Sequence, residues 1–335
     1  MRPSNSHQSV LSFLWPIIFS FANLPAQEST VYASITAAKL FVVGGTNAKS
    51  GLFYQRPSDD TTWQHLGSKN TRAFSSTARG QLIYIAAGNG VHRSTDGGKS
   101  WKITTGWEIT EVLSVSIDPK NSQNVYLATA YGIYKSSDGG TTWKQMNAGL
   151  TATFSSSVIV DQNSSDIIYC ATEDGVFRSE DGAQTWRRLE GLRVRNIRVV
   201  AQNPRASQML VAGTENNGLY ISREGGSVWA KSDAGIEHTT FWAIAFDPQH
   251  AEIIYAGGHV TGVYKTVNGG RSWQRYHDGL INLNIHALAV DPANTNRVYA
   301  GTMWSGVFRS ENGGVSWRPA GLSGAQVWSI SIQPF

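Results

Sequence analysis

Hydrophobic and polar residues follow a four-part pattern that recurs along this chain of 335 residues. One unit contains the runs FWAIAFDP at 241–248, IIYAG at 253–257, GVYKT at 262–266 and SWQRY at 272–276. Short runs of β-forming residues separated by Gly, Pro and Asn indicate antiparallel strands. The pattern therefore predicts four strands per unit, which we call A to D in chain order.

An octet that ends in tryptophan joins strands C and D of each unit, and SSDGGTTW at 136–143 is its most regular copy. The first copy, which ends at Trp63, lacks glycine. The closing tryptophans lie 38 to 44 residues apart, at positions 63, 101, 143, 186, 229, 273 and 317. Self-similarity at this period predicts a propeller or a solenoid, and four strands per repeat favour propeller blades.

The residue types of the octet fit a tight turn. Asp or Asn at the third place is expected to bond the backbone two residues on, and the hydroxyl at the first place does so more weakly. The Gly-Gly pair supplies positive φ, and the tryptophan is expected to lock the turn onto its own blade. The octet residues given this structural role are Asp96, Trp101, Asp138, Trp143, Asp181, Trp186, Asn268, Trp273, Asn312 and Trp317.

A count of the strands predicts how the ring closes. Six A strands precede their own unit, and the seventh A-type run is VWSISIQP at 327–334. We therefore predict an all-β fold, a single seven-bladed β-propeller at 40–335 with four-stranded antiparallel blades, closed by the C-terminal strand. Blade one would take its other three strands from 40–66, with 27–39 as an N-terminal segment. The alternative is that Val31–Thr36 supplies the innermost strand of blade one.

The N-terminus has the layout of a secretory signal peptide. Arg2 is followed by the apolar stretch 10–22, which is too short to span a bilayer, and Leu24-Pro25-Ala26 offers a cleavage site. We predict that residues 1–26 are a signal peptide cleaved after Ala26. The protein would then be secreted or periplasmic.

Composition narrows the function classes. The net charge of +4 is too mild for a dedicated nucleic-acid binder, and one cysteine cannot form a disulfide framework. His238, His259 and His286 enter the last blades from the same face, next to Glu237, but their spacing favours solvated histidines over a zinc site. We predict a monomer without a metal or cofactor that does not span a membrane.

The octets and the stretch VYAGT…GVFRS…GG…SW within 298–317 resemble the Asp-box (bacterial neuraminidase, BNR) repeat, and the resemblance covers about residues 40–335. Relatives include photosystem II stability/assembly-factor-like propellers, the sortilin-type receptor propeller, sialidases and xyloglucan-active glycosidases. Sialidases resemble this chain in the boxes but also carry a Phe/Tyr-Arg-Ile-Pro motif. The nearest match, Gln55-Arg56-Pro57, lacks the Ile. The resemblance implies a fold that serves unrelated functions.

Functional residues are expected where the repeat is broken, on the face that carries the D–A and B–C loops. The octets and the A–B loops would lie on the opposite face. Tryptophans outside both the octets and the predicted signal peptide map to the first of these faces, and they are Trp107, Trp242, Trp304 and Trp328. Aromatic side chains there could stack on sugar rings or anchor a peptide.

One equivalent position in the successive A strands, which we call a column, supports this expectation. Its members are Leu113, Ser156, Arg198, Trp242, His286 and Trp328. The neighbouring columns are apolar or small, whereas this one is bulky, polar and variable, as a binding site at the channel mouth requires. The alternative is that these side chains only plug the channel.

Charged residues on the same face supply two further candidates. Five arginines lie within twelve residues, with Glu190 as the only acid among them: Arg187, Arg188, Arg193, Arg195 and Arg198. Arg193, Arg195 and Arg198 could bind a partner carboxylate or an anionic glycan. The candidate catalytic carboxylates are Glu108, Glu173, Glu215 and Glu237, and Glu111, Asp174 and Asp278 share their face.

These observations favour an exported, non-catalytic interaction module, assembly-factor-like or receptor-like, that binds a protein or a glycan on the face opposite the octets. The alternative is a sialidase-like or xyloglucanase-like glycoside hydrolase acting at the same face, which would need two carboxylates across a cleft.

Overall fold

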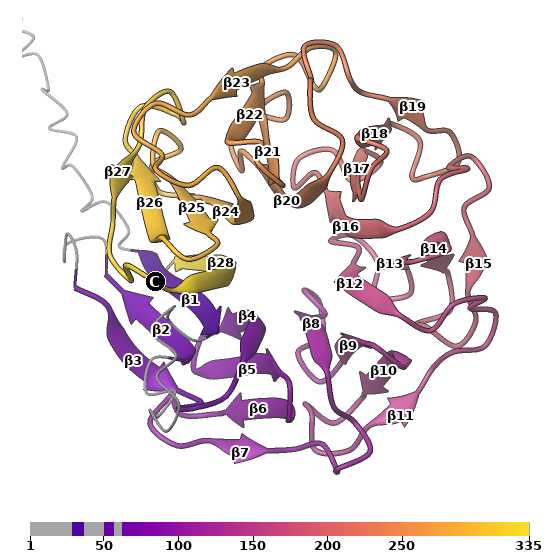
Figure 1. The fold of residues 1–335 in the computed structure, drawn as a ribbon. Coiled ribbons are helices and arrows are strands. Elements are labelled where there is room, and N and C mark those ends of the chain that lie inside the picture. The colour runs from indigo at the N-terminus through magenta and orange to yellow at the C-terminus, as the bar shows by residue number, and fades with distance from the viewer. Residues whose placement is uncertain (1–28, 37–49, 57–61, 335) are drawn as a thin grey trace, which may run out of the picture.

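The computed structural model describes residues 29–36, 50–56 and 62–334. In these residues the chain forms seven four-stranded antiparallel sheets arranged as the blades of a ring (Figure 1), and it contains no helix. The predicted all-β, seven-bladed propeller is therefore confirmed. No helix able to cross a membrane occurs in the described parts of the chain. The predicted signal peptide, residues 1–26, lies outside the described residues.

Each blade runs from an innermost A strand to an outermost D strand. Blade one consists of β28 (Gln326–Pro334), β1 (Ser29–Thr36), β2 (Gly51–Gln55) and β3 (Gln64–Gly67). Blade two consists of β4 (Ala73–Arg79), β5 (Leu82–Ala87), β6 (Gly90–Ser94) and β7 (Lys102–Ile103). Blade three consists of β8 (Val112–Ile117), β9 (Val125–Thr129), β10 (Gly132–Ser136) and β11 (Lys144–Gln145).

The remaining blades follow the same order. Blade four consists of β12 (Ser155–Val160), β13 (Ile168–Thr172), β14 (Gly175–Ser179) and β15 (Arg187–Arg188). Blade five consists of β16 (Ile197–Gln202), β17 (Leu210–Thr214), β18 (Leu219–Ser222) and β19 (Ala230–Lys231). Blade six consists of β20 (Phe241–Phe246), β21 (Ile254–Gly258), β22 (Val263–Thr266) and β23 (Gln274–Tyr276). Blade seven consists of β24 (Ile285–Val290), β25 (Val298–Thr302), β26 (Gly306–Ser310) and β27 (Arg318–Pro319).

Blade one closes the ring with strands from both ends of the described chain. The C-terminal β28 is its innermost strand, as predicted, and it pairs antiparallel with β1 (Figure 1). The structure differs from the prediction in the second strand. Ser29–Thr36 fills this place, although its sequence favoured an N-terminal segment or the innermost strand. Residues 37–49, which include the run expected to form the second strand, lie outside the described residues.

The octets form hydrogen-bonded turns, with roles that differ from the prediction. In the copy that ends at Trp101, the Ser94 hydroxyl accepts the amide hydrogens of Asp96 and Gly98, as expected of a first-place hydroxyl. The Asp96 carboxylate, however, accepts from the amide and hydroxyl of Ser100, four residues on. The predicted hydrogen bond from this carboxylate to the backbone two residues on is therefore wrong. Gly97 and Gly98, both at positive φ, turn the chain so that the amide of Ser100 faces the carboxylate.

Five of the seven octet tryptophans donate a hydrogen bond from Nε1 to the preceding blade, whereas the sequence pattern predicted that each would lock its own blade. The Nε1 of Trp229 donates within its own octet, to the Gly226 carbonyl. The indole Nε1 of Trp186 donates to the Met146 carbonyl of the preceding blade at 2.8 Å. Trp63 donates to the Ala320 carbonyl at 2.6 Å, across the seam between blades seven and one. Each D strand is short and pairs with the C strand of its own blade, so an indole bond to the preceding blade gives this edge of the blade a second attachment. A bond in the forward direction runs from the Tyr84 hydroxyl to the Gly139 carbonyl in the next octet, at 2.6 Å.

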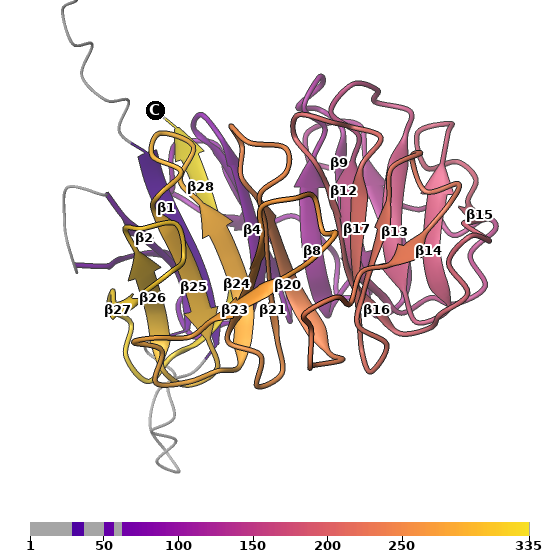
Figure 2. The same cartoon turned by 90° about the horizontal axis from the view of Figure 1, so that it is seen from above.

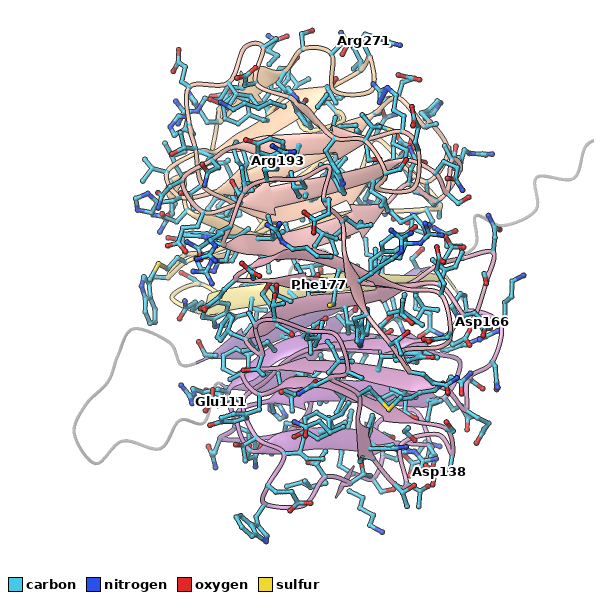
Figure 3. All side chains as sticks on the ribbon, turned by 90° about the vertical axis from the view of Figure 1, so that its right-hand side faces the viewer. Glu111, Asp138, Asp166, Phe177, Arg193 and Arg271 are labelled. Atoms are coloured by element: carbon cyan, nitrogen blue, oxygen red, sulfur yellow. The ribbon has the colours of Figure 1, made fainter. Side chains whose placement is uncertain are left out.

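The antiparallel order of the strands separates two faces of the disc. Strands A and C run toward the A–B loops and the octets, and strands B and D run back, so the D–A and B–C loops share the other face. Figure 2 shows the blades side by side in the disc. Figure 3 labels Glu111 of a D–A loop on one side, and Asp138 of an octet and Asp166 of an A–B loop on the other. We call these the loop face and the octet face.

Candidate functional site

A β-bulge interrupts the innermost strand of every blade at the same place. In blade six, Phe241 pairs with Gly258 and Ala243 pairs with Gly257, which leaves Trp242 without a partner in the ladder. The corresponding bulged residues of the seven blades are Phe74, Leu113, Ser156, Arg198, Trp242, His286 and Trp328. A bulge bends the strand and re-aims the extra side chain, and bulges are frequent beside active sites.

All seven bulged residues line one cavity of about 430 Å³, together with Phe154 and Glu215. The bulges lie where the A strands enter from the D–A loops, so the cavity opens at the channel mouth on the loop face. Six of the seven form the column predicted from the sequence. Phe74 was missed because β4 is followed neither by a proline nor by a residue aligned with one, from which the column is counted, although Ala73-Phe74 matches Phe241-Trp242. The volume lies within the usual range for small-molecule pockets. We call this cavity the mouth cavity.

Aromatic rings form one half of the mouth cavity. His286 lies between the two indoles, with ring centroids 4.4 Å from Trp242 and 4.9 Å from Trp328. Phe74 meets the other side of Trp328 edge to face at 5.6 Å, and His259 meets Trp242 at 5.8 Å. These contacts join blades six, seven, one and two into a continuous aromatic arc. The Trp328 indole is further oriented by a 3.0 Å hydrogen bond to the Thr36 hydroxyl.

Polar groups occupy the other half. Nε of Arg198 donates to Oε2 of Glu215 at 2.9 Å, and the same guanidinium lies 5.9 Å from the centroid of Phe154. Ser156 donates its hydroxyl hydrogen to the Ile197 carbonyl at 3.0 Å, so its oxygen lone pairs remain able to accept a hydrogen bond. The polar half thus offers both donors and acceptors from neighbouring blades four and five.

His286 is held in the neutral form. Its Nε2 atom is buried without a hydrogen-bond partner among the described residues. Burial lowers the pKa of His286 to about 4, and the nearby His259 adds to the effect. At neutral pH the imidazole therefore contributes an uncharged ring to the aromatic arc.

This depressed pKa predicts a pH-dependent contribution to stability. The unfolded chain takes up a proton at His286 below a pKa of about 6.5, whereas the folded chain takes it up only near pH 4. The contribution is therefore complete above pH 6.5 and declines as the pH falls through this window. We expect urea unfolding of wild type and of His286→Gln to show that the wild type loses about 2 kcal/mol more between pH 7 and pH 4. Parallel pH profiles of the two proteins would contradict this assignment.

The candidate carboxylates do not converge. Glu215 lines the mouth cavity, while Glu108, Glu173 and Glu237 are exposed and lie outside its wall. Of the other acids on this face, Glu111 pairs with a neighbouring arginine, Asp174 does likewise, and Asp278 accepts the Trp317 amide hydrogen through its backbone carbonyl. Within the described residues the wall of the cavity thus holds one carboxylate.

The predicted basic run is largely neutralised by ion pairs, one with Glu190 of the run itself and three with acids from outside it. The pairs are Arg187 with Glu180, Arg188 with Glu190, Arg195 with Asp174, and Arg198 with Glu215. Arg193 is exposed and forms no ion pair with the described residues. Of these arginines only Arg198 lines the mouth cavity.

The remaining candidates lie apart from the mouth cavity. Trp107 is 91% exposed in a D–A loop, and Trp304 is half-buried at positive φ in a B–C turn. Nδ1 of His238 lies within hydrogen-bond distance of the Tyr264 hydroxyl, at 2.8 Å. His259 instead contacts the Trp242 ring, so the two histidines have different partners. Among the described residues no three His, Cys, Asp or Glu side chains are grouped to hold a metal ion.

This fold and cavity define a seven-bladed β-propeller with a candidate ligand site at the channel mouth. A family model described as the DUF6242 beta propeller domain matches residues 12–271, and the chain belongs to that family. No curated protein matches the chain.

Solved propellers of different functions are similar in structure. A GH74 enzyme from Niastella koreensis has a TM-score of 0.62 and 22% identity, covering 73% of this chain and 44% of its own. The extracellular domain of BT4673 from B. thetaiotaomicron has a TM-score of 0.65 and 19% identity, covering 83% and 38%. YCF48 bound to D1 peptide has a TM-score of 0.58 and 15% identity, covering 76% and 89%. This chain thus spans less than half of the GH74 and BT4673 chains, and identities this low show a shared fold alone.

Proposed function

We propose that this protein is an exported, non-catalytic binding module whose ligand occupies the mouth cavity on the loop face. The observation that carries the proposal is the β-bulge repeated in all seven blades. The side chains at this bulge differ from blade to blade, and they include Phe, Leu, Ser, Arg, Trp and His. The packing of one blade against the next does not require such variety. A repeated backbone device with varied side chains is what a shaped and specific cavity requires.

The chemistry of the wall supports binding over hydrolysis. Glycoside hydrolysis by the usual mechanism uses two carboxyl groups that flank the scissile bond. The mouth cavity has Glu215, and Arg198 already pairs with it. With Glu215 as the one carboxylate of its wall, the mouth cavity lacks the second carboxyl group that this mechanism requires. The similarity to the GH74 enzyme therefore does not lead us to propose its activity.

Two further parts of the proposal come from the sequence. The octet turns, in which a third-place carboxylate anchors the seventh-place amide, support assignment of the repeats to the Asp-box type. The basic start, apolar stretch and small residue at 26 support export through a cleaved signal peptide. Mass spectrometry of the secreted protein tests the second point, because cleavage after Ala26 leaves Gln27 at the new N-terminus.

Loss of the two cavity indoles should abolish ligand binding without unfolding the protein. We expect the double variant Trp242→Ala/Trp328→Ala to lose its ligands on an array of glycans and of peptides from exported proteins, with affinities reduced about 30-fold or more. The array measures how much of each ligand the wild type and the double variant bind. A parallel assay measures whether the wild type releases reducing sugar. Circular dichroism checks that the double variant keeps its fold.

Trp107→Ala is the matched control, because Trp107 lies on the same face but outside the mouth cavity. It should bind as wild type does. Ligands that bind equally well to the double variant would contradict the proposal. Sugar release that disappears in Glu215→Gln would contradict its non-catalytic part.

A further inference from the structure

We infer that the mouth cavity binds an uncharged glycosyl unit of an oligosaccharide or polysaccharide. This inference rests on the proposed binding function and adds the chemical class of the ligand. It follows from the charges of the wall and from its shape.

The wall of the mouth cavity carries no net charge. Its one guanidinium, Arg198, is paired with its one carboxylate, Glu215. The third titratable side chain of the wall, His286, is half-buried between two indoles, and its Nε2 atom is buried. An anionic ligand would meet a guanidinium whose charge is already neutralised, next to a carboxylate that repels it.

Cations are disfavoured although the wall is rich in aromatic rings. An aromatic cage attracts a cation through the negative faces of its rings. Two rings of this wall already have a guanidinium near them, Arg72 at 5.6 Å from the Phe74 centroid and Arg198 at 5.9 Å from the Phe154 centroid. Arg72 is itself held by Glu111 at 2.9 Å. These two rings therefore already have a cation beside them, which leaves fewer ring faces for a ligand cation.

The two halves of the cavity match the two sides of a sugar ring. A pyranose presents C–H groups on its face and hydroxyl groups around its edge. The aromatic arc of Trp242, His286 and Trp328 offers apolar surface, and the opposite half offers the Ser156 oxygen and the Arg198–Glu215 pair for hydroxyl groups. The paired guanidinium donates and the carboxylate accepts, so both senses of hydrogen bond are available to a neutral polyol.

The cavity is also built to keep its shape. Seven of its nine lining residues belong to the innermost strands, and the other two, Phe154 and Glu215, lie next to strand ends. A site on paired strands holds its side chains more closely than one on loops. A preformed cavity loses little conformational freedom when it takes up a small rigid ring.

The test is a titration of wild-type protein, followed by indole fluorescence, with five hexasaccharides. Three are neutral, namely cellohexaose, laminarihexaose and maltohexaose. Two carry charge, namely hexamannuronate, which is anionic, and hexaglucosamine, which is cationic. We expect saturable quenching by at least one neutral hexasaccharide, a loss of about tenfold or more in Trp242→Ala, and no comparable binding of the charged probes.

Glu215→Gln provides a second readout that a merely structural role would not give. This substitution leaves Arg198 without its negative partner, so the wall gains one positive charge. We expect the affinity for hexamannuronate to rise about tenfold. The affinity for the neutral probe should fall by less than about tenfold. Glu108→Gln is the matched control, because Glu108 is exposed on the same face and outside the wall, and it should not change the preference.

The outcomes separate the inference from the proposed function. A charged probe or an array peptide that binds wild type better than every neutral probe, and that depends on Trp242, overturns the inference but keeps the binding module. No saturable quenching by any neutral hexasaccharide overturns the inference as well. Binding of a neutral probe that is unchanged in Trp242→Ala contradicts both.

Discussion

Replacing Trp186 with alanine should destabilise the protein by about 3–5 kcal/mol. This octet tryptophan is 5% exposed and packs with Phe177 and Cys170 of its own blade and Tyr126 of the preceding blade. Its Nε1 and its backbone amide donate to carbonyls of the preceding D–A loop, both at 2.8 Å. The variant loses apolar contacts on both sides of a blade interface and leaves the Met146 carbonyl without its indole donor.

Urea unfolding followed by circular dichroism measures the change. Trp107→Ala is the matched control, because an exposed tryptophan should change the free energy of unfolding by no more than about 0.5 kcal/mol. Trp186→Phe should fall between the two, since it keeps much of the apolar contact and loses the hydrogen bond. A Trp186→Ala variant as stable as Trp107→Ala would show that the octet tryptophans do not join the blades.

Removal of residues 326–335 should prevent cooperative folding. This deletion takes away β28, which pairs with β1 along eight residue pairs and buries Val327 completely. Val327 and Ile330 pack with Val31 and Tyr299 across the seam between blades one and seven. The loss exposes an apolar surface and a long strand edge, and its cost exceeds the roughly 5–15 kcal/mol by which domains are usually stable.

The expected measurements are an absent or strongly broadened urea transition and binding of a dye that reports exposed apolar surface. Ser329→Ala, in the middle of the same strand, is the control. Its hydroxyl is buried without a partner among the described residues, so the change should be neutral within about 0.5 kcal/mol. A truncated chain that unfolds with the wild-type midpoint would refute the role assigned to the C-terminal strand.

Much of the fold was predictable because the strand pattern of one blade is repeated along the sequence. The period of the tryptophans predicted seven blades, and the surplus A-type run at 327–334 predicted how the ring closes. The position of Ser29–Thr36 in blade one was not predictable, because the run is short and two registrations compete for it. The reach of the octet tryptophan to the preceding blade was also missed, since a local pattern does not tell which neighbour a side chain meets.

The candidate site was predictable where it follows the repeat. Equivalent positions in the A strands place Trp242, His286 and Trp328 in one column of the sequence, and the same three side chains meet in the mouth cavity. The bulges that aim these residues were not visible, because they depend on the pairing of two strands. The ion pair of Arg198 with Glu215 was missed for a related reason: Glu215 lies just after the end of the next strand, β17, and not in the local run of charges.

A crystal structure of the wild-type protein soaked with cellohexaose, or with the best neutral hexasaccharide from the titration, tests the central claim most directly. We expect one glycosyl ring in the mouth cavity, with carbon atoms within about 4.5 Å of Trp242 or Trp328 and a hydroxyl group bonded to Arg198 or Glu215. A sugar bound on the octet face, or between blades with the mouth cavity empty, would contradict the account.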